Sequence, residues 1–353
     1  PSVYQALTFL LDHLPPKSHF ILAGRGEPPL PLARYRARGE LQELGTDDLR
    51  FQSEETKVFL IERVVPDLSP KDLEQLQAQL EGWIAGLQLL ALARTRGFVE
   101  MGQVKGPAIS GRQRFIADYL REEVLDELPD EWREFLLQSS VLERLSGPLC
   151  EAVTAKDGGQ VMLEALEMEG LFLIPLDDKR EWFRYHPLFA DFLAEELKRA
   201  QPDIVPDLHG RAARWYLSEN LLEPAFDHAV AGREEQVVKQ IAEHRFDLML
   251  HIGQHKLLRR WIGALPEAWQ FQYPVIGLTQ AGLLGMSGNM AACLKLVDKV
   301  EEAILQSGRE DSRWQLARVN TVRCLIACFQ NDLAKAEPLA ERALQDLPES
   351  DLH

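Results

Sequence analysis

The C-terminal part of this chain repeats itself, and this repetition restricts the fold more than any other feature. The stretches LLGMSGNMAACLKLVDKVEEAIL and CLIACFQNDLAKAEPLAERALQDL align with Gly288 over Asn331, an offset of 43 residues (331 − 288). A looser third copy, YLSENLLEPAFDHAVAG, occupies residues 216–232. Each copy has helical apolar spacing around a turn signal. We therefore expect residues 201–353 to form an α-solenoid of TPR-like helix pairs, with a period above the roughly 34 residues of a tetratricopeptide repeat.

The N-terminal stretch has a different pattern. The continuous apolar run FILAGR at 20–25 predicts a buried parallel strand, and ELQELG at 40–45 predicts a second one, joined through a helix around LARYRARG. Two strands and a helix in so few residues indicate the end of an α/β sheet. Arg25 would then lie at the carboxyl edge, where such sheets bind their ligands.

Residues 113–200 read as a compact unit. Its predicted helices, with Ser146 and Asp157 as caps, cover 113–126, 131–139, 147–154 and 158–169. The run LFLIPLDDKREWFRYH then predicts a β-hairpin, and Pro187 opens a last helix. Several helices followed by a hairpin are typical of a winged helix. This one is too acidic to bind DNA unaided.

Composition excludes some classes of function. The formal net charge of −16 opposes a nucleic-acid surface. Four cysteines without a pairing pattern predict a reducing, cytoplasmic location, and no apolar run is long enough to span a membrane. The chain starts at Pro1 within a helical pattern and stops just after another, so we expect an internal part of a longer protein.

Four stretches in order carry a family resemblance: FLLDHLPPKSHFILAGRGEPPLPLARYRARGELQEL, LEGWIAGLQLLAL, RLSGPLCEAV and WFRYHPLFADFL. Together they resemble the large ATP-binding regulators of the LuxR family, the MalT-like transcriptional regulators of the STAND class. The resemblance covers nearly all of residues 1–200 and continues less specifically into the repeats. It implies a mainly α fold in four parts: the C-terminal part of an α/β nucleotide-binding domain (1–50), a helical lid (51–112), a winged helix (113–200) and a TPR-like sensor (201–353).

The resemblance also implies roles for five residues. Arg25 matches the sensor arginine that reads the γ-phosphate, and Gly82, Trp83 and Ile84 match a lid motif that lies against adenine and sugar. Many members have proline where this chain has Ile84. His186 corresponds to the winged-helix histidine that contacts the β-phosphate of ADP in related proteins. The alternatives are structural: Arg25 packed over a sheet edge, Trp83 in the core, and His186 as a satisfied core histidine.

No catalytic or metal site is predicted. His251 and His255 have a zinc-compatible spacing but no third ligand beside them. The resemblance implies ATP or ADP with Mg²⁺ in the full-length protein, a slow ATPase at most. The phosphate loop and Mg²⁺ site are expected before residue 1 and a helix-turn-helix after residue 353, so this part alone is not expected to be an enzyme. The sequence does not tell whether this part alone binds a nucleotide.

We therefore expect the central and sensor region of a regulator switched by ATP and ADP. A small-molecule inducer or a regulatory protein would bind the repeats and control self-association, while DNA would be bound only through the later domain. A helical-repeat scaffold without a nucleotide switch is one alternative. A STAND protein with an effector that does not bind DNA is another. The sequence does not identify the signal, the target genes or the oligomeric state.

Overall fold

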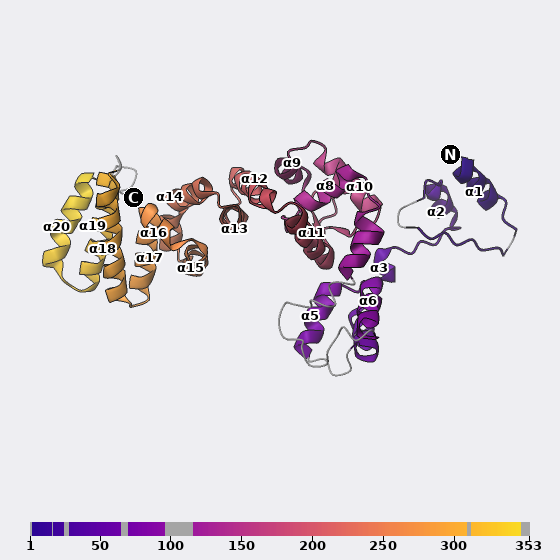
Figure 1. Ribbon diagram of the computed structural model, residues 1–353, viewed down its shortest axis with the longest axis horizontal. Helices are drawn as coiled ribbons and strands as arrows, with labels where there is room; N and C mark the ends of the chain where they lie inside the picture. The colour runs from indigo at the N-terminus through magenta and orange to yellow at the C-terminus, as the bar shows by residue number, and fades with distance from the viewer. Residues whose placement is uncertain are drawn as a thin grey trace. The chain divides into compact units, whose positions relative to one another are not determined.

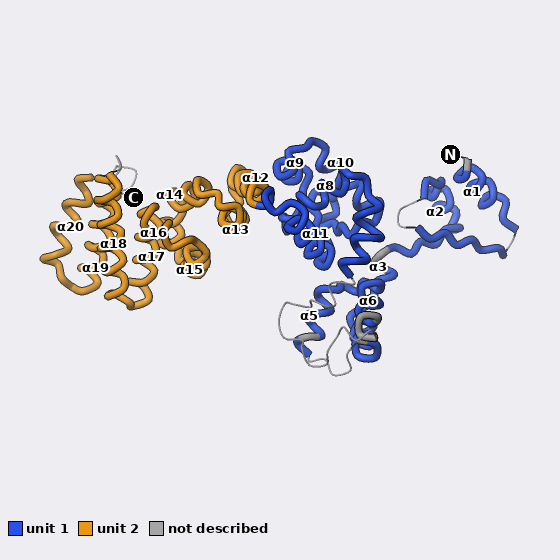
Figure 2. The backbone as a smooth tube through the Cα atoms, viewed as in Figure 1, with its two compact units in different colours: residues 1–205 blue, residues 206–353 orange. Residues whose placement is uncertain are grey.

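The computed structural model describes residues 2–15, 17–24, 28–64, 70–95, 116–308 and 312–346. These residues are mainly helical, as predicted (Figure 1). The chain divides into two compact units, residues 1–205 and 206–353 (Figure 2).

The described residues between 2 and 64 contain helices but none of the predicted strands. The elements are α1 (Ser2–Asp12), α2 (Leu32–Arg38), α3 (Thr46–Leu49), α4 (Ser53–Phe59) and the π-helix η1 (Leu60–Val64). Residues 20–24 and 40–45 join no β-ladder, and Ile21 is 90% exposed. The strand predictions are therefore wrong for this chain. A continuous apolar run is not sufficient for a strand. A strand also needs a neighbouring strand that forms hydrogen bonds with its N–H and C=O groups.

The segment predicted as the helical lid, for which we keep the name lid, contains a pair of helices, α5 (Pro70–Leu80) and α6 (Ile84–Thr95). Pro70 is the first residue of α5, as the Ser69-Pro70 sequence predicts, since proline is favoured at the first position of a helix. The turn between the helices contains two residues of positive φ, Glu81 (44°) and Gly82 (73°). The stretch 97–112 is Gly-rich and weakly patterned, which predicts a loop, and it lies outside the described residues.

The winged helix follows the predicted order closely. Helix 116–120 runs into the π-helix η2 (Arg121–Leu125), followed by α8 (Asp130–Ser139), α9 (Gly147–Thr154) and α10 (Gly159–Met168). The hairpin strands β1 (Leu173–Pro175) and β2 (Phe183–Tyr185) are antiparallel, with Leu173 opposite Tyr185, and α11 (Pro187–Ala200) comes next. Ser146 is the N-cap of α9 as predicted, whereas α10 has Gly158 rather than Asp157 at its N-cap. Gly158 takes a left-handed conformation there, which an aspartate adopts less easily.

Helices continue through the rest of the chain. After the short 3₁₀ turn η3 (Pro202–Ile204), these are α12 (Val205–Ser218), α13 (Leu222–Gly232), α14 (Glu235–His251), α15 (His255–Ala264), α16 (Glu267–Gln272), α17 (Pro274–Met286), α18 (Met290–Ser307), α19 (Ser312–Phe329) and α20 (Leu333–Asp346). The last four lie side by side (Figure 1). Buried residues of α17, α18 and α19, among them Ala281, Val297 and Val319, form their shared core.

The turns inside the four helix pairs α12–α13, α14–α15, α17–α18 and α19–α20 have one design, which the turn at Arg233 between α13 and α14 also adopts. Asn220, Gly253, Gly288 and Asn331 are all left-handed. In each case the next residue donates its N–H to the carbonyl five positions back, at 2.9–3.0 Å, which is the Schellman pattern that ends a helix. The turns are 33 (253 − 220), 35 (288 − 253) and 43 (331 − 288) residues apart. The long period predicted from the sequence therefore applies only between the last two turns, which α18 and α19, of 18 residues each, separate.

Cys324 and Cys328 share one helical face in the sequence, which predicts that they pack with Cys293 in the core of the repeats, and this prediction is wrong in part. Cys293 is buried in the core as expected, but Cys324 is only half-buried and Cys328 is exposed. Both belong to α19, and the helical face that they share is not fully covered by the neighbouring helices.

Candidate functional site

The candidate site is the contact between the lid and the winged helix, which we call the joint: Leu80, Glu81 and Trp83 on one side, Arg184 and His186 on the other. Its ionic part joins residues 103 positions apart. One guanidinium nitrogen of Arg184, Nη2, donates to both carboxylate oxygens of Glu81, at 2.9 and 3.1 Å. The two side chains are 31% and 22% exposed, so water screens this pair only in part.

The hairpin places Arg184 for this contact. Side chains alternate along a strand, and on β2 Phe183 and Tyr185 turn into the winged-helix core. The hydroxyl of Tyr185 is fixed there at 2.7 Å from Ser139 Oγ. Arg184 between them must project from the opposite face, where Glu81 at the end of α5 meets it.

His186 joins the same two parts through an uncharged contact. Its side chain is 4% exposed, and its Nε2 lies 3.1 Å from the carbonyl oxygen of Leu80. A carbonyl only accepts, so Nε2 carries the proton and donates. Burial lowers the pKa of His186, although the bond to Leu80 opposes this shift, and the imidazole is therefore neutral near pH 7. Its Nδ1 is buried and has no hydrogen-bond partner among the described residues.

An aromatic cluster completes the joint around Trp83. The Trp83 ring centroid lies 5.3 Å from that of Phe172, 6.1 Å from that of His186 and 6.2 Å from that of Tyr119. The first two pairs are edge-to-face, an arrangement that aromatic rings favour. Trp83 is half-buried, so much of its ring area packs against the winged helix.

Gly82 brings the turn between α5 and α6 close to the segment before α4. A Cβ on this residue would lie 2.3 Å from the carbonyl oxygen of Phe51, and its φ of +73° also disfavours other residues. The N–H of Phe51 donates to the Gly82 carbonyl at 3.1 Å. A cavity of about 330 Å³ opens beside this contact, with a lining that includes Arg50, Gln52 and Ser53.

The structure brings three of the five predicted residues together. Gly82 and Trp83 of the lid and His186 of the winged helix all belong to this region, while Ile84 begins α6 with 41% of its surface exposed. Arg25 lies outside the described residues. Nucleotide contacts by these five residues stay predictions. Sequence reasoning missed Glu81 and Arg184, for which the only local signal was a charged residue between the apolar residues of WFRYH.

Two absences concern the described part of the chain. It holds no group of three or more His, Cys, Asp or Glu side chains arranged for a metal ion. None of its helices has the length and apolar character needed to cross a membrane.

Comparison with known proteins shows which proteins this chain resembles in sequence. Residues 121–205 match the model of the MalT winged helix domain. The chain is 33% identical over 347 residues to the HTH-type transcriptional regulator MalT of Serratia proteamaculans, and 31% identical over 349 residues to that of Klebsiella pneumoniae. These matches include 98% and 99% of this chain but 38% of either relative. They confirm the family resemblance seen in the sequence.

A solved structure with the same general fold is also known. It is the crystal structure of a Signal Transduction ATPase with Numerous Domains (STAND) protein with a tetratricopeptide repeat sensor from Pyrococcus horikoshii. The TM-score is 0.52 at 15% identity, over 87% of this chain and 44% of that one. The likeness concerns the fold alone.

Proposed function

We propose, on the premise that this chain is a relative of the MalT-type transcriptional regulators, that it forms the lid, winged helix and signal sensor of a cytoplasmic regulator switched by ATP and ADP. The carrying observation is the extent of that match. It spans 98% of this chain and so includes the lid, the winged helix and the helical repeats together. A free-standing helical scaffold would have no reason to share the first two with such regulators.

In this proposal the protein is in its closed form when the contacts of the joint are made. Glu81–Arg184 and His186–Leu80 hold the winged helix against the lid, and ADP favours that arrangement. A signal on the repeats favours exchange for ATP, after which the joint opens and the protein self-associates and binds DNA through another domain. The signal must bind the open form better, because equal affinity for both forms shifts no population.

The residues near Gly82 suit one edge of a nucleotide. Arg50 supplies a cation, and Gln52 and Ser53 supply neutral hydrogen-bonding groups along the cavity. Exposed Ile84 offers an apolar surface. Mg²⁺, when bound with the nucleotide, would neutralise phosphate charge.

His186 takes a more specific role than its resemblance implied. Its one N–H is directed at Leu80, and Nδ1 has no proton to give to a phosphate while the ring is neutral. A phosphate contact would need protonation of a buried ring or release of Leu80. We infer that His186 acts mainly by holding the backbone of the lid, so that release of Leu80 accompanies opening.

The test is ADP and ATP titration of the full-length natural gene product by calorimetry. We expect ADP to bind, with His186→Ala and Arg25→Ala each weakening ADP binding about tenfold or more. Ile252→Ala, at an exposed position in the repeats, is the control and should leave the affinity unchanged. Absence of ADP and ATP binding by the parent protein would reject the nucleotide switch and leave the helical scaffold.

A further inference from the structure

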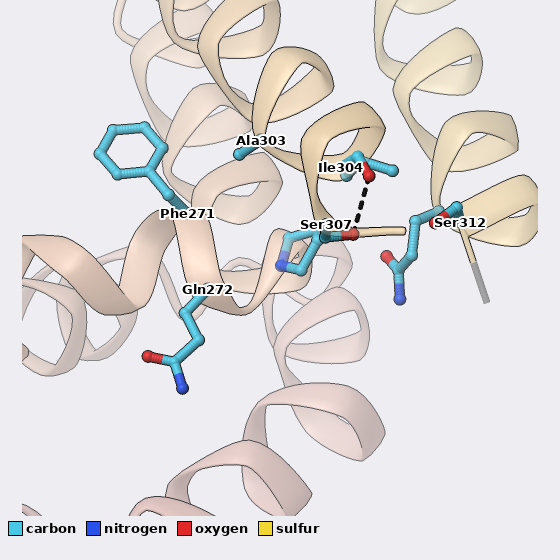
Figure 3. Close-up of a pocket in the computed structure, with 8 residues that line it drawn as sticks. Phe271, Gln272, Ala303, Ile304, Ser307 and Ser312 are labelled. Atoms are coloured by element: carbon cyan, nitrogen blue, oxygen red, sulfur yellow. Dashed lines mark hydrogen bonds between the residues drawn. The ribbon is translucent and has the colours of Figure 1, made fainter. Parts of the chain in front are cut away.

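A cavity of about 220 Å³ lies within the helical repeats, among α16, α17, α18 and α19. Figure 3 shows it, with a lining that includes Phe271, Gln272, Ile304, Ser307, Ser312 and Gln315. We propose that this cavity is a binding site for an uncharged small molecule, a single ring that carries hydroxyl or amide groups.

The volume sets the size of the molecule. An apolar cavity of about 150 Å³ is enough to hold benzene. A cavity of about 220 Å³ therefore holds one six-membered ring with one or two polar substituents. It is below the roughly 300–1,000 Å³ typical of sites for larger ligands, so a chain of several rings would not fit inside it.

The residues that line the cavity decide which ligand charge it can accept. No acidic or basic side chain is among the residues that line this cavity in the described part of the chain. An ion would find no counter-charge in this lining, and the net charge of −16 adds a general disadvantage for anions. Carboxylates and phosphates are thereby disfavoured, and so are organic cations.

The polar groups beside the cavity decide which hydrogen-bonding groups a ligand should carry. Ser307 donates its hydroxyl proton to the Ile304 carbonyl at 2.7 Å (Figure 3), which leaves its oxygen as an acceptor. Gln272 is exposed, and its amide nitrogen donates to Glu235 and to the Tyr273 hydroxyl, so its side chain extends away from Ser307 (Figure 3). The Ser307 hydroxyl oxygen is thus an acceptor beside the cavity, and it favours a ligand with O–H or N–H donors.

The remaining wall suits the body of a ring. The half-buried Phe271 ring and the buried Ile304 give it an apolar face. Gln315, 4% exposed, places a second amide within the same lining. A molecule with one apolar face and a polar edge would satisfy both kinds of surface.

The position gives such binding a consequence. Phe271 belongs to α16, Pro274 to α17, Ile304 to α18 and Gln315 to α19, so one ligand would contact four successive helices of the repeats. Its binding would stiffen their packing. As the place where a signal acts, the cavity rests on the function proposed above; as a binding site, it rests on its lining alone.

Calorimetric titration of the 353-residue chain with matched probes tests this inference. The uncharged probes are nicotinamide and myo-inositol, and their charged counterparts are nicotinate and myo-inositol 1-phosphate. For molecules of this size we expect a Kd of about 1 mM for at least one uncharged probe. The charged counterpart should bind about tenfold more weakly or worse.

Two variants of α18 locate the site. Ala303→Trp fills the cavity and should weaken binding of the uncharged probe about tenfold or more, whereas Ala291→Trp, at an exposed position of the same helix, should not. Ala303 is only half-buried, so this variant is expected to fold, which circular dichroism checks.

The possible results of these titrations either support the binding site or overturn it. The inference is overturned if neither uncharged probe binds at about 10 mM, if the charged counterparts bind equally well, or if binding survives in Ala303→Trp. Binding that the Ala303→Trp variant abolishes, in a full-length protein that binds no nucleotide, would keep the binding site and reject the nucleotide switch.

Discussion

The joint and the helical repeats are stabilised by different kinds of contact. The four turns of the repeats use one local motif, in which a left-handed residue and a backbone bond span five positions of the chain. The joint uses contacts that occur once each and connect residues about a hundred positions apart. A local, repeated motif tolerates the loss of one copy. A unique contact has no substitute, so a switch is better built at the joint.

The largest expected difference concerns two glycines with similar backbone angles. Gly82→Ala should cost about 4 kcal/mol of unfolding free energy in residues 1–205, because the new Cβ would meet the Phe51 carbonyl at 2.3 Å. Gly288→Ala should cost about 1 kcal/mol, since nothing lies within 4 Å and only the positive φ is penalised. Urea unfolding of both variants measures this. Equal losses would remove the contrast between the two regions.

The next effect concerns a histidine pair near the start of the repeats. Nδ1 of His209 and Nδ1 of His228 are 2.9 Å apart, and burial, followed by repulsion from His209, lowers the pKa of His228 to about 4. In the unfolded chain His228 has an ordinary histidine pKa near 6.5. Between pH 6.5 and 4 the unfolded chain therefore binds a proton at His228 that the folded chain does not bind. Stability should therefore be full above pH 6.5 and fall by about 3 kcal/mol as the pH drops toward 4.

Thermal unfolding between pH 7 and 4 checks this dependence for residues 206–353. The variant His228→Gln should flatten the profile, and His251→Gln, exposed in the same unit, should keep it. A parent profile that is already flat would show that the imidazole pair does not titrate as its burial requires.

The smallest effect tests whether one copy of the repeated turn matters. Asn289 caps α18 by accepting the N–H of Ala292 at 3.2 Å. Asn289→Ala should cost about 1 kcal/mol and Asn289→Gly only a few tenths, because glycine leaves the cap open to water. Chemical unfolding of the two variants compares them. A loss of several kcal/mol would mean that the repeats are as intolerant as the joint.

The sequence predicts elements whose signals are local. Helices α9 and α11 begin where Ser146 and Pro187 indicated, and the alignment of Gly288 with Asn331 identifies two turns of equal conformation. In each case the residues that decide the structure lie within a few positions of it, so a periodic pattern with a cap is enough.

What the sequence could not predict depends on distant partners. The run at 20–24 looks like a strand, yet no described neighbour pairs with it. Trp83 and His186 were identified by resemblance, but their mutual contact was not, and Glu81–Arg184 had no local signal. Pairing across about a hundred residues depends on how the hairpin and the lid pack, which composition and periodicity do not contain.

The central claim is that the named contacts hold the winged helix against the lid. It is tested most directly by the spin-label distance between cysteines introduced at Gln75 and Asp178, two exposed positions, with Cys324 and Cys328 replaced by serine. We predict one narrow distance distribution in the parent and a second, longer distance when Arg184→Gln and His186→Ala are combined. An unchanged narrow distribution in that double variant would contradict the claim.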